Sequence, residues 1–219
     1  AILDDPALEL VGLLVHGEAK RGRDAGLLAG RAPVGVIATT DIAQLVALDA
    51  DCVCYMMLTP EPEHIVAFLE SGKRVVTTAG LMHPHSADAA LAEWLESACR
   101  RGSSALYATG INPGFVDATL PLAMSQLCRR IDTILIQEYA DCGKYPAPHI
   151  LSVMGFGRTP EQIAAEGAAN LELMCTFFRQ SVAALAEDLG LPVDEVRETR
   201  EFVLASKGYD IAAGHIPAG

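Results

Sequence analysis

Residues 51–79, DCVCYMMLTPEPEHIVAFLESGKRVVTTA, contain the pattern that decides the fold. Two short apolar runs, 51–58 and 74–79, are typical of buried strands. The residues between them, 61–73, place apolar side chains at the i, i+3, i+4 spacing of an amphipathic helix. Parallel strands need a long connection of this kind. The stretch therefore predicts one strand–helix–strand unit of an α/β sheet.

The same alternation continues on both sides of this stretch. Further strands are expected at residues 8–16, 34–40 and 104–110, and further helices at 41–50 and 85–102. The strands are apolar on both faces, as in a sheet covered by helices on both sides. We therefore expect a Rossmann-type, doubly wound parallel sheet over residues 1–112, which is the fold of a dinucleotide-binding domain.

The pattern changes near residue 113. A helix is expected at 116–130, a long strand at 132–142, two helices within 159–190 and a strand pair within 195–214. Strands and helices no longer alternate one for one. The sequence therefore predicts a second, α+β domain over residues 113–219.

A Rossmann-type domain opens with a strand, a G-x-G-x-x-G turn and a helix. None of the 19 glycines stands in that spacing, and the chain opens with AILDDPALELVG, as at the end of a helix that leads into a second strand. We expect the first strand and its Gly-rich turn, about 30 residues, to lie outside this sequence, and the second domain to be C-terminally incomplete. The alternative is a shorter fold that begins at Ala1.

The composition excludes some partners. The net charge is −12 and the pI about 4.8, which repels phosphate backbones and anionic lipid, so neither nucleic acid nor a membrane is an expected partner. No apolar run approaches the ~20 residues that span a bilayer. The six cysteines form no C-x-x-C pair and are expected to be reduced, mostly buried thiols. We expect a soluble, cytoplasmic protein without a metal site.

The loop after residues 8–16 predicts the choice of cofactor. His16 stands where a dinucleotide fold usually has an acid for the ribose hydroxyls, and three cations, Lys20, Arg21 and Arg23, follow it. Basic residues at this place suit a 2′-phosphate, so NADP(H) is favoured over NAD(H). The alternative is a basic loop that is merely solvated.

Two other loops follow strand ends, where ligands bind in open α/β sheets. The predicted cofactor-binding residues there are Leu58, Thr59, Pro60, Thr78, Ala79 and Gly80. His83, in the second loop, is a candidate for contact with the substrate or for catalysis.

The stretch ATGINPGF, residues 108–115, predicts a sharp turn into a helix. Gly110 permits a turn that a side chain would crowd, Asn112 is expected to cap the helix, and Pro113 to take its first position. The backbone N–H groups of Gly114 and Phe115 would then be free to face a cofactor, with Asn112 and Pro113 as cofactor-binding residues. An ordinary strand-to-helix turn is the alternative.

Polar side chains follow the strand expected at 132–142. The expected substrate-contacting residues are Glu138, Tyr139 and Tyr145. A turn at 141–143 would break the strand and let Asp141 and Lys144 project together. We expect Lys144 to act as a polar substrate contact or acid, with Asp141 as its partner.

The segments RDAGLLAG (23–30), VVTTAG (75–80), ATGINPGF (108–115) and EYADCGKYPAP (138–148) together resemble the dihydrodipicolinate reductase superfamily. They are most similar to its branch of 2,4-diaminopentanoate dehydrogenases and NAD(P)H-dependent amine dehydrogenases. The resemblance extends from about Ala1 to about Glu201. It implies a Rossmann domain, a substrate-binding and dimerisation domain, and hydride transfer between a nicotinamide cofactor and a C=N or C–NH2 bond.

Two departures from these relatives limit the expected chemistry. Lys144 stands at the place of the reductases' lysine, but Ala140 and Asp141 replace their histidine pair. Ala79, Gly80 and Leu81 stand where the amine dehydrogenases are expected to carry a glutamate. We expect a homodimeric NAD(P)(H)-dependent enzyme that acts on an amine, imine or carbonyl compound. The alternatives are a dihydrodipicolinate reductase and a non-catalytic paralogue that binds a dinucleotide.

Overall fold

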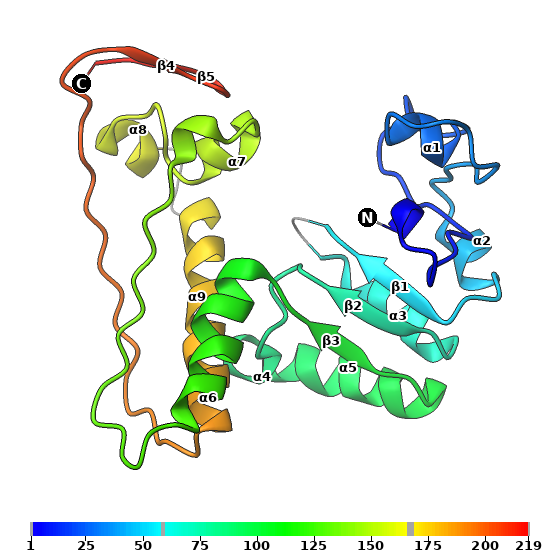
Figure 1. The fold of residues 1–219 in the computed structure, drawn as a ribbon, viewed down its shortest axis with the longest axis horizontal. Helices are drawn as coiled ribbons and strands as arrows, with labels where there is room; N and C mark the ends of the chain where they lie inside the picture. The colour runs from blue at the N-terminus through cyan, green and yellow to red at the C-terminus, as the bar shows by residue number, and fades with distance from the viewer. Residues whose placement is uncertain (1, 58–59, 166–168, 219) are drawn as a thin grey trace. The chain divides into compact units, whose positions relative to one another are not determined.

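The structure is a computed structural model that describes residues 2–57, 60–165 and 169–218 (Figure 1). The chain divides into two compact units, the first formed by residues 1–79 and 90–107 and the second by residues 80–89 and 108–219. The elements up to the last strand of the sheet are η1 (Ile2–Asp4), α1 (Ala25–Leu28), α2 (Ile42–Val46), β1 (Cys52–Tyr55), α3 (Pro62–Glu70), β2 (Arg74–Thr77), α4 (Pro84–Ala87), α5 (Ala89–Gly102) and β3 (Leu106–Ala108). The later elements are η2 (Ile111–Thr119), α6 (Leu120–Ser125), η3 (Cys142–Lys144), α7 (Pro148–Val153), α8 (Pro160–Ala165), α9 (Ala169–Asp188), β4 (Tyr209–Ile211) and β5 (Gly214–Ile216).

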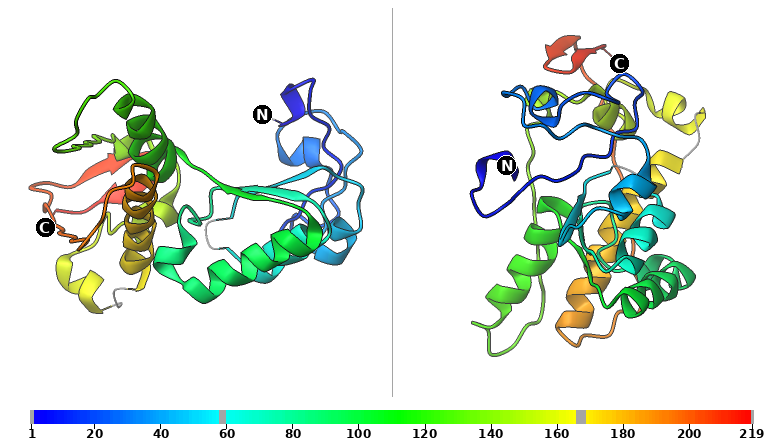
Figure 2. Two further views of the ribbon diagram at one scale, coloured as in Figure 1. Left: turned by 90° about the horizontal axis from the view of Figure 1, so that it is seen from below. Right: turned by 90° about the vertical axis from the view of Figure 1, so that its right-hand side faces the viewer.

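A three-stranded parallel sheet organises the first unit. Its strands lie in the order β1-β2-β3, with Cys52 paired to Arg74 and Tyr55 paired to Thr77. The connections β1–α3–β2 and β2–α5–β3 both run in the same direction across the sheet. Because crossovers between parallel strands are right-handed, α3 and α5 lie on the same face. Figure 2 shows α5 running along one side of the strands. The α/β class and the strand–helix–strand unit predicted from residues 51–79 are confirmed.

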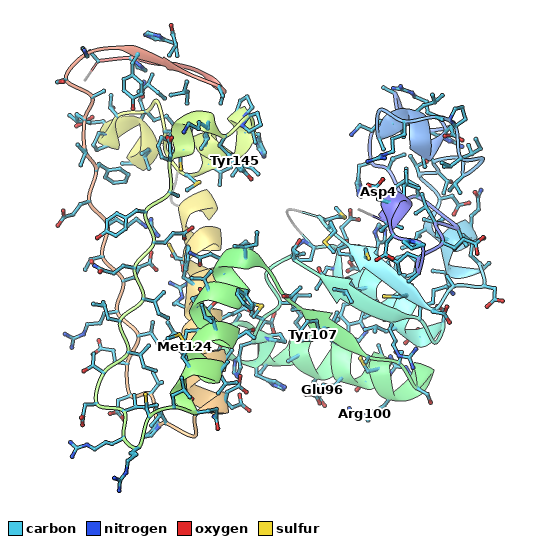
Figure 3. The ribbon with its side chains drawn as sticks, in the orientation of Figure 1. Asp4, Glu96, Arg100, Tyr107, Met124 and Tyr145 are labelled. Carbon is cyan, nitrogen blue, oxygen red and sulfur yellow. The ribbon has the colours of Figure 1, made fainter. Side chains whose placement is uncertain are left out.

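The core of the first unit lies between this face of the sheet and its helices. Ile65 and Leu69 of α3 are fully buried, as is Val75 of β2. Their i, i+4 spacing brings two apolar side chains to one face of α3, and burial of each contributes about 1.5–3 kcal/mol. On α5, Leu95 is buried towards the core, whereas Glu96 and Arg100 form an exposed ion pair of 3.2 Å (Figure 3).

The strands predicted at residues 8–16 and 34–40 are wrong. These segments meet through one isolated parallel bridge, between Leu14 and Thr39, and residues 34–40 make a second, antiparallel bridge through Ile37. Val15 donates to Thr39 O and Thr39 donates to Leu13 O. A strand needs a continuous ladder of such bonds with its neighbour, which apolar composition alone does not provide.

The prediction of mostly buried cysteines is also wrong. Of the six, Cys175 is buried, Cys99 and Cys142 are half-buried, and Cys52, Cys54 and Cys128 are exposed. Cys52 and Cys54 alternate along β1 as expected, but they point to the face of the strand opposite the buried Tyr55. The crossover helices α3 and α5 lie on one face of the sheet, and the alternate set of side chains, Cys52 and Cys54, is exposed.

Helix α9 is the central element of the second unit. It packs against η2, α4 and α6. The two helices predicted within residues 159–190 are confirmed as α8 and α9. The helix predicted at 116–130 ends earlier, at Ser125.

The strands predicted for the second unit are mostly wrong. Residues 132–142, all of which the structure describes, form no strand and are exposed apart from the last. Within residues 195–214 the expected strand pair shrinks to the antiparallel hairpin of β4 and β5, which extends to Ile216. Alternating apolar residues form a strand only where a partner supplies a ladder of hydrogen bonds. In the described part of the chain, no helix is both long and apolar enough to cross a membrane.

The fully buried hydroxyl of Thr77 fastens the end of the sheet. It donates to Tyr55 O at 2.7 Å and accepts from the Ala79 N–H at 3.0 Å. We predict that Thr77→Val, which keeps the shape but removes both bonds, lowers the free energy of unfolding by roughly 1–3 kcal/mol. Denaturant unfolding measures this loss. The control is Thr78→Val at the neighbouring exposed threonine, and an equal loss there would contradict the prediction.

Candidate functional site

The carboxyl end of β1 carries a polar cluster. Tyr55, the last residue of the strand, is buried, and its hydroxyl oxygen accepts a hydrogen bond of 2.9 Å from the Glu61 N–H. Burial raises the pKa of Tyr55; the bond from Glu61 lowers it, and the negative charges of Glu61 and Glu63 raise it further. The hydroxyl therefore stays protonated at neutral pH and holds the start of α3 against the sheet.

The carboxylate of Glu61 lies between two imidazole rings. Glu61 Oε1 is 3.7 Å from His16 Nδ1, and Glu61 Oε2 is 3.5 Å from His64 Nε2. Glu61 is the N-cap residue of α3, but its side chain makes no capping bond. The other ring nitrogen of His64, Nδ1, is buried and has no hydrogen-bond partner among the described residues. We call these three residues the His16–Glu61–His64 cluster.

The predicted basic residues lie in the loop that follows His16. Lys20, Arg21 and Arg23 are all exposed, and Arg21 lies 3.6 Å from Glu18 in an exposed pair. An exposed pair of this kind contributes little stability, because water and salt screen it. The three side chains remain available to an anion that approaches from solvent.

The predicted cofactor residues near the strand ends differ in accessibility. Leu58 and Thr59 lie outside the described residues. Pro60 is half-buried, Thr78 is exposed and Ala79 is buried. Thr78 Oγ1 lies 3.4 Å from Met56 Sδ. Among the residues that the structure describes at these two strand ends, Thr78 is the one whose hydroxyl can reach a ligand.

Asp24 fixes the segment RDAGLLAG. The residue is buried, and its carboxylate accepts hydrogen bonds from four backbone N–H groups, those of Gly26, Leu27, Val34 and Gly35. Burial by itself raises the pKa of Asp24, but the four N–H groups outweigh it and hold the pKa below the usual value. One carboxylate thus caps α1 and ties it to the loop ten residues further on.

In the second unit, Gln180 of α9 clamps the loop that contains Gly80 and His83. Its side-chain oxygen accepts from the His83 N–H at 3.0 Å, and its amide nitrogen donates to Gly80 O at 2.8 Å. Gln180 is 3% exposed. Gly80 has φ +69°, and a Cβ there would lie 2.1 Å from the ring of Phe177. Both the backbone angle and the close approach of α9 therefore require glycine.

The ring of His83 is already paired on both sides. Nδ1 accepts from the Ser86 N–H at 3.2 Å, which places the ring proton on Nε2, and Nε2 contacts the carboxylate of Glu187. Helix α9 thus brings a carboxylate to the loop in which a glutamate was expected and is missing. His83 can reach a substrate only if one of these bonds opens.

The turn at residues 110–115 corrects one prediction and confirms another. A Cβ on Gly110 would lie 2.3 Å from Pro113 O, so this residue permits a turn that a side chain would crowd. However, Asn112 does not cap the helix and Pro113 is not its first residue, because both have extended backbone angles and are joined by a cis peptide bond.

The predicted free N–H groups of this turn are not free. The Gly114 N–H donates to Asp117 Oδ1 at 2.5 Å, and the Phe115 N–H donates to Gly110 O at 2.9 Å. The side-chain amide of Asn112 instead donates to Glu138. Asn112 Oδ1 is buried and has no hydrogen-bond partner within the described residues. That oxygen is the acceptor which this turn offers to a ligand.

Asp141 and Lys144 lie together, as the turn at 141–143 predicts. Lys144 Nζ is 3.3 Å from Asp141 Oδ2, and Asp141 caps η3 by accepting from the Gly143 N–H at 3.1 Å. The Lys144 side chain is 89% exposed. The predicted substrate residues Tyr139 and Tyr145 are also exposed, and Figure 3 shows Tyr145 just before α7.

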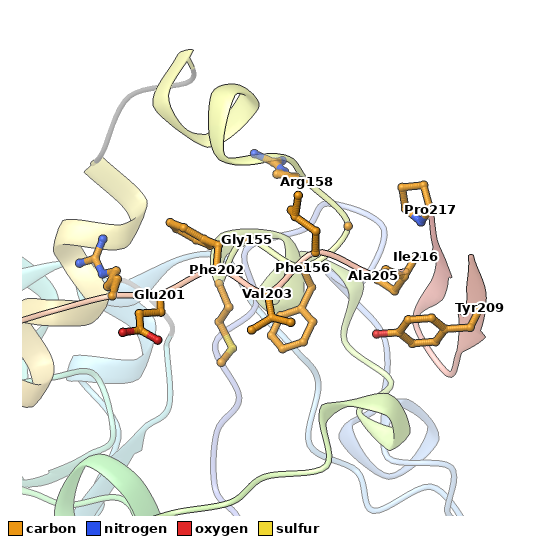
Figure 4. Close-up of a pocket in the computed structure, with 14 residues that line it drawn as sticks. Gly155, Phe156, Arg158, Glu201, Phe202, Val203, Ala205, Tyr209, Ile216 and Pro217 are labelled. Atoms are coloured by element: carbon orange, nitrogen blue, oxygen red, sulfur yellow. The ribbon is translucent and has the colours of Figure 1, made fainter. Parts of the chain in front are cut away.

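The second unit also contains a cavity of about 550 Å³ that the sequence did not reveal (Figure 4). It lies between the turn at 154–158, the segment 200–205 and the β4–β5 hairpin, and its lining includes Phe156, Arg158, Phe202, Val203, Tyr209 and Ile216. None of the predicted site residues lines it. The hairpin is joined to the Asp141–Lys144 loop by a 2.9 Å bond from the Ala212 N–H to Gly143 O.

Sequence reasoning missed the residues that position these loops. Thr77 and Gln180 carry no recognisable pattern, because each binds at least one backbone group that is distant in the chain. Glu61 stood out only as the residue that begins a helix. Among the described residues, no group of three or more His, Cys, Asp or Glu side chains is placed to hold a metal ion.

Comparison with known proteins shows similarity to amine dehydrogenases. The chain is 30% identical over 210 residues to an amine dehydrogenase from Streptomyces virginiae, covering 92% of this chain and 58% of that protein. Its structure resembles that of an amine dehydrogenase from Mycobacterium smegmatis with a TM-score of 0.76 and 22% identity, covering 96% of this chain and 65% of that one. The chain thus spans a little over half of the curated relative, and the structural likeness establishes the α/β fold. No protein-family model matches.

The lowered pKa of Asp24 makes its contribution to stability depend on pH. Because the folded-state pKa lies below the unfolded value of about 3.9, the stabilisation is complete above that value and is lost as the pH falls through the folded-state pKa. We predict that Asp24→Asn lowers the melting temperature at pH 7 and that the gap to wild type narrows below about pH 4. Thermal unfolding across this pH range measures both. Asp49→Asn, at an exposed aspartate, is the control and should show no such narrowing.

The clamp formed by Gln180 gives a second prediction. Gln180→Leu leaves the His83 N–H and Gly80 O without partners and should lower the free energy of unfolding by roughly 2 kcal/mol. Faster hydrogen exchange of the His83 amide should accompany the loss. The matched control is Gln126→Leu, at an exposed glutamine, which should stay within about 0.5 kcal/mol of wild type. Unchanged exchange at His83 would show that the clamp does not hold the loop.

Proposed function

We propose that this chain forms the main part of an NAD(P)(H)-dependent oxidoreductase that acts on a carbon–nitrogen bond, either reducing an imine or oxidising the corresponding amine. The observation that carries the proposal is the 30% identity, over 210 residues, to an amine dehydrogenase. The shared fold supports it. We also propose that the enzyme belongs to the dihydrodipicolinate reductase superfamily, in its branch of amine dehydrogenases, and the resemblance of four sequence segments supports this assignment.

We propose that the first unit is part of a Rossmann-type fold and binds the dinucleotide. The carboxyl end of β1 offers the groups that a ribose needs: a carboxylate, two imidazoles and, at His64 Nδ1, a buried nitrogen with no partner in the described chain. Lys20, Arg21 and Arg23 supply positive charge for a 2′-phosphate, which supports NADP(H) as the preferred cofactor. When bound, the nicotinamide supplies or accepts the hydride.

The chain's own residues must bind the substrate and manage one proton. Oxidation of an amine needs a base that keeps the nitrogen neutral before hydride leaves. We propose that Lys144 contacts the reacting nitrogen or acts as the acid, with Asp141 as its partner, because the two form a pair beside the β4–β5 hairpin. The apolar side chains that line the cavity on that hairpin, among them Phe156 and Phe202, suit the carbon skeleton of a small amine.

We further propose that the protein is a homodimer. The segment 132–142 lacks a strand partner, and Leu135 on it is 77% exposed. A second copy that pairs with this segment would supply the missing ladder of hydrogen bonds.

The test is turnover of the protein with NADP(H) or NAD(H) and a panel of amines and carbonyl compounds with ammonia. We expect turnover by wild type, and a loss of about 100-fold in Lys144→Met, the size of one acid–base contribution. The control is Lys207→Met at another exposed lysine. Cofactor binding without turnover by wild type would instead favour a non-catalytic dinucleotide-binding protein, and wild-type rates in Lys144→Met would refute the assignment of that residue.

A further inference from the structure

The carboxylate of Glu61 is held in place but is not used by its own helix. Its backbone N–H is fixed by the buried Tyr55 hydroxyl at 2.9 Å, so the residue begins α3 at a defined point on the end of β1. An acidic N-cap side chain usually turns back to accept from the N–H groups of the first helical turn. The Glu61 side chain makes no such bond.

The two histidines explain the direction of this carboxylate. His16 and His64 lie 3.7 and 3.5 Å from its two oxygens, one on each. The Glu61 side chain nevertheless remains 46% exposed, so its carboxylate oxygens can accept further hydrogen bonds from a ligand. Three segments of the chain, 8–16, β1 and α3, thus converge on one acid at the carboxyl end of a parallel strand.

His16 stands at the place where a dinucleotide fold usually has the acid that binds the ribose hydroxyls. The structure puts a carboxylate beside it from a different loop, about 45 residues further along the chain. We propose that Glu61 is the residue that binds the 2′- and 3′-hydroxyls of the adenosine ribose and so determines how well NAD(H) competes with NADP(H). This inference rests on the proposed function.

The chemistry of the two cofactors makes Glu61 a discriminating group. A carboxylate accepts hydrogen bonds from both hydroxyls of an unmodified ribose, and it repels a 2′-phosphate that carries about two negative charges. Lys20, Arg21 and Arg23 have the opposite effect on the phosphate, but all three are exposed and therefore screened. The balance between the Glu61 carboxylate and the three exposed cations then sets the preference between NAD(H) and NADP(H), and the protein should bind both cofactors.

The experiment compares two neighbouring glutamates of α3. We expect Glu61→Gln to raise the ratio of NADPH to NADH affinity about tenfold, as expected for loss of one partly screened charge next to the 2′-phosphate. Glu63→Gln removes the same charge from an exposed position two residues further along the chain and should leave the ratio within twofold of wild type. The readout is the dissociation constant of each reduced cofactor, measured by nicotinamide fluorescence without any amine.

A second variant at Glu61 distinguishes loss of the carboxylate from a defect in the start of α3. Serine is a favoured N-cap residue, so Glu61→Ser keeps the start of α3 while removing the carboxylate, and it should raise the ratio as Glu61→Gln does. An unchanged ratio in both Glu61 variants, or an equal change in Glu63→Gln, overturns the inference and leaves the proposed function intact. If wild type binds neither cofactor, the proposed function fails and this inference fails with it.

Discussion

The two hydrogen bonds of Gln180 are the constraint on which the arrangement of the second unit depends. The loop that starts at Gly80 has a positive φ angle and packs its backbone against the ring of Phe177. One buried side chain binds this loop at two points, and the ring of His83 in the loop contacts Glu187 of the same helix. The same loop then supports the turn at residues 110–114, since Met82 lies beside Gly114. Helix α9 therefore acts as a rigid support for two segments that the sequence places far from it.

The sequence predicted elements correctly where local pattern and tertiary pairing agree. β1, α3 and β2 combine a clear apolar period with immediate neighbours in the chain, so each has its partner within about 20 residues. Residues 132–142 have an equally apolar pattern, but a strand there needs a partner that local sequence cannot specify. Residues 8–16 fail in the same way, because one bridge at Leu14 does not make a ladder.

In the candidate site, too, the sequence predicted local contacts correctly and failed where the contact depends on the backbone conformation. The pairing of Asp141 with Lys144 was predictable, because a turn over three residues fixes it. The contact of Asn112 with Glu138 joins two predicted residues, yet it contradicts the expected role of Asn112 as a helix cap. The cap was wrong because Gly114, with φ +137°, delays the helix and lets Asp117 take the N–H that a cap would use. Such choices depend on backbone angles that residue type only biases.

Among the described residues, the side chains that hold the loops in place are buried, whereas side chains such as Glu61 and Lys144 are accessible to solvent. Asp24, Thr77 and Gln180 are buried, and the side chain of each forms hydrogen bonds with backbone groups of a loop. Buried polar groups of this kind are strongly fixed, because losing a partner leaves a desolvated group. Two of the groups offered to ligands, Glu61 and Lys144, have partly or largely exposed side chains and can change without removing a core contact. In the proposed enzyme, substitutions at Glu61 or Lys144 would change the contacts with a ligand while the loops keep their positions, since Thr77 and Gln180, which bind the loop backbone, are different side chains.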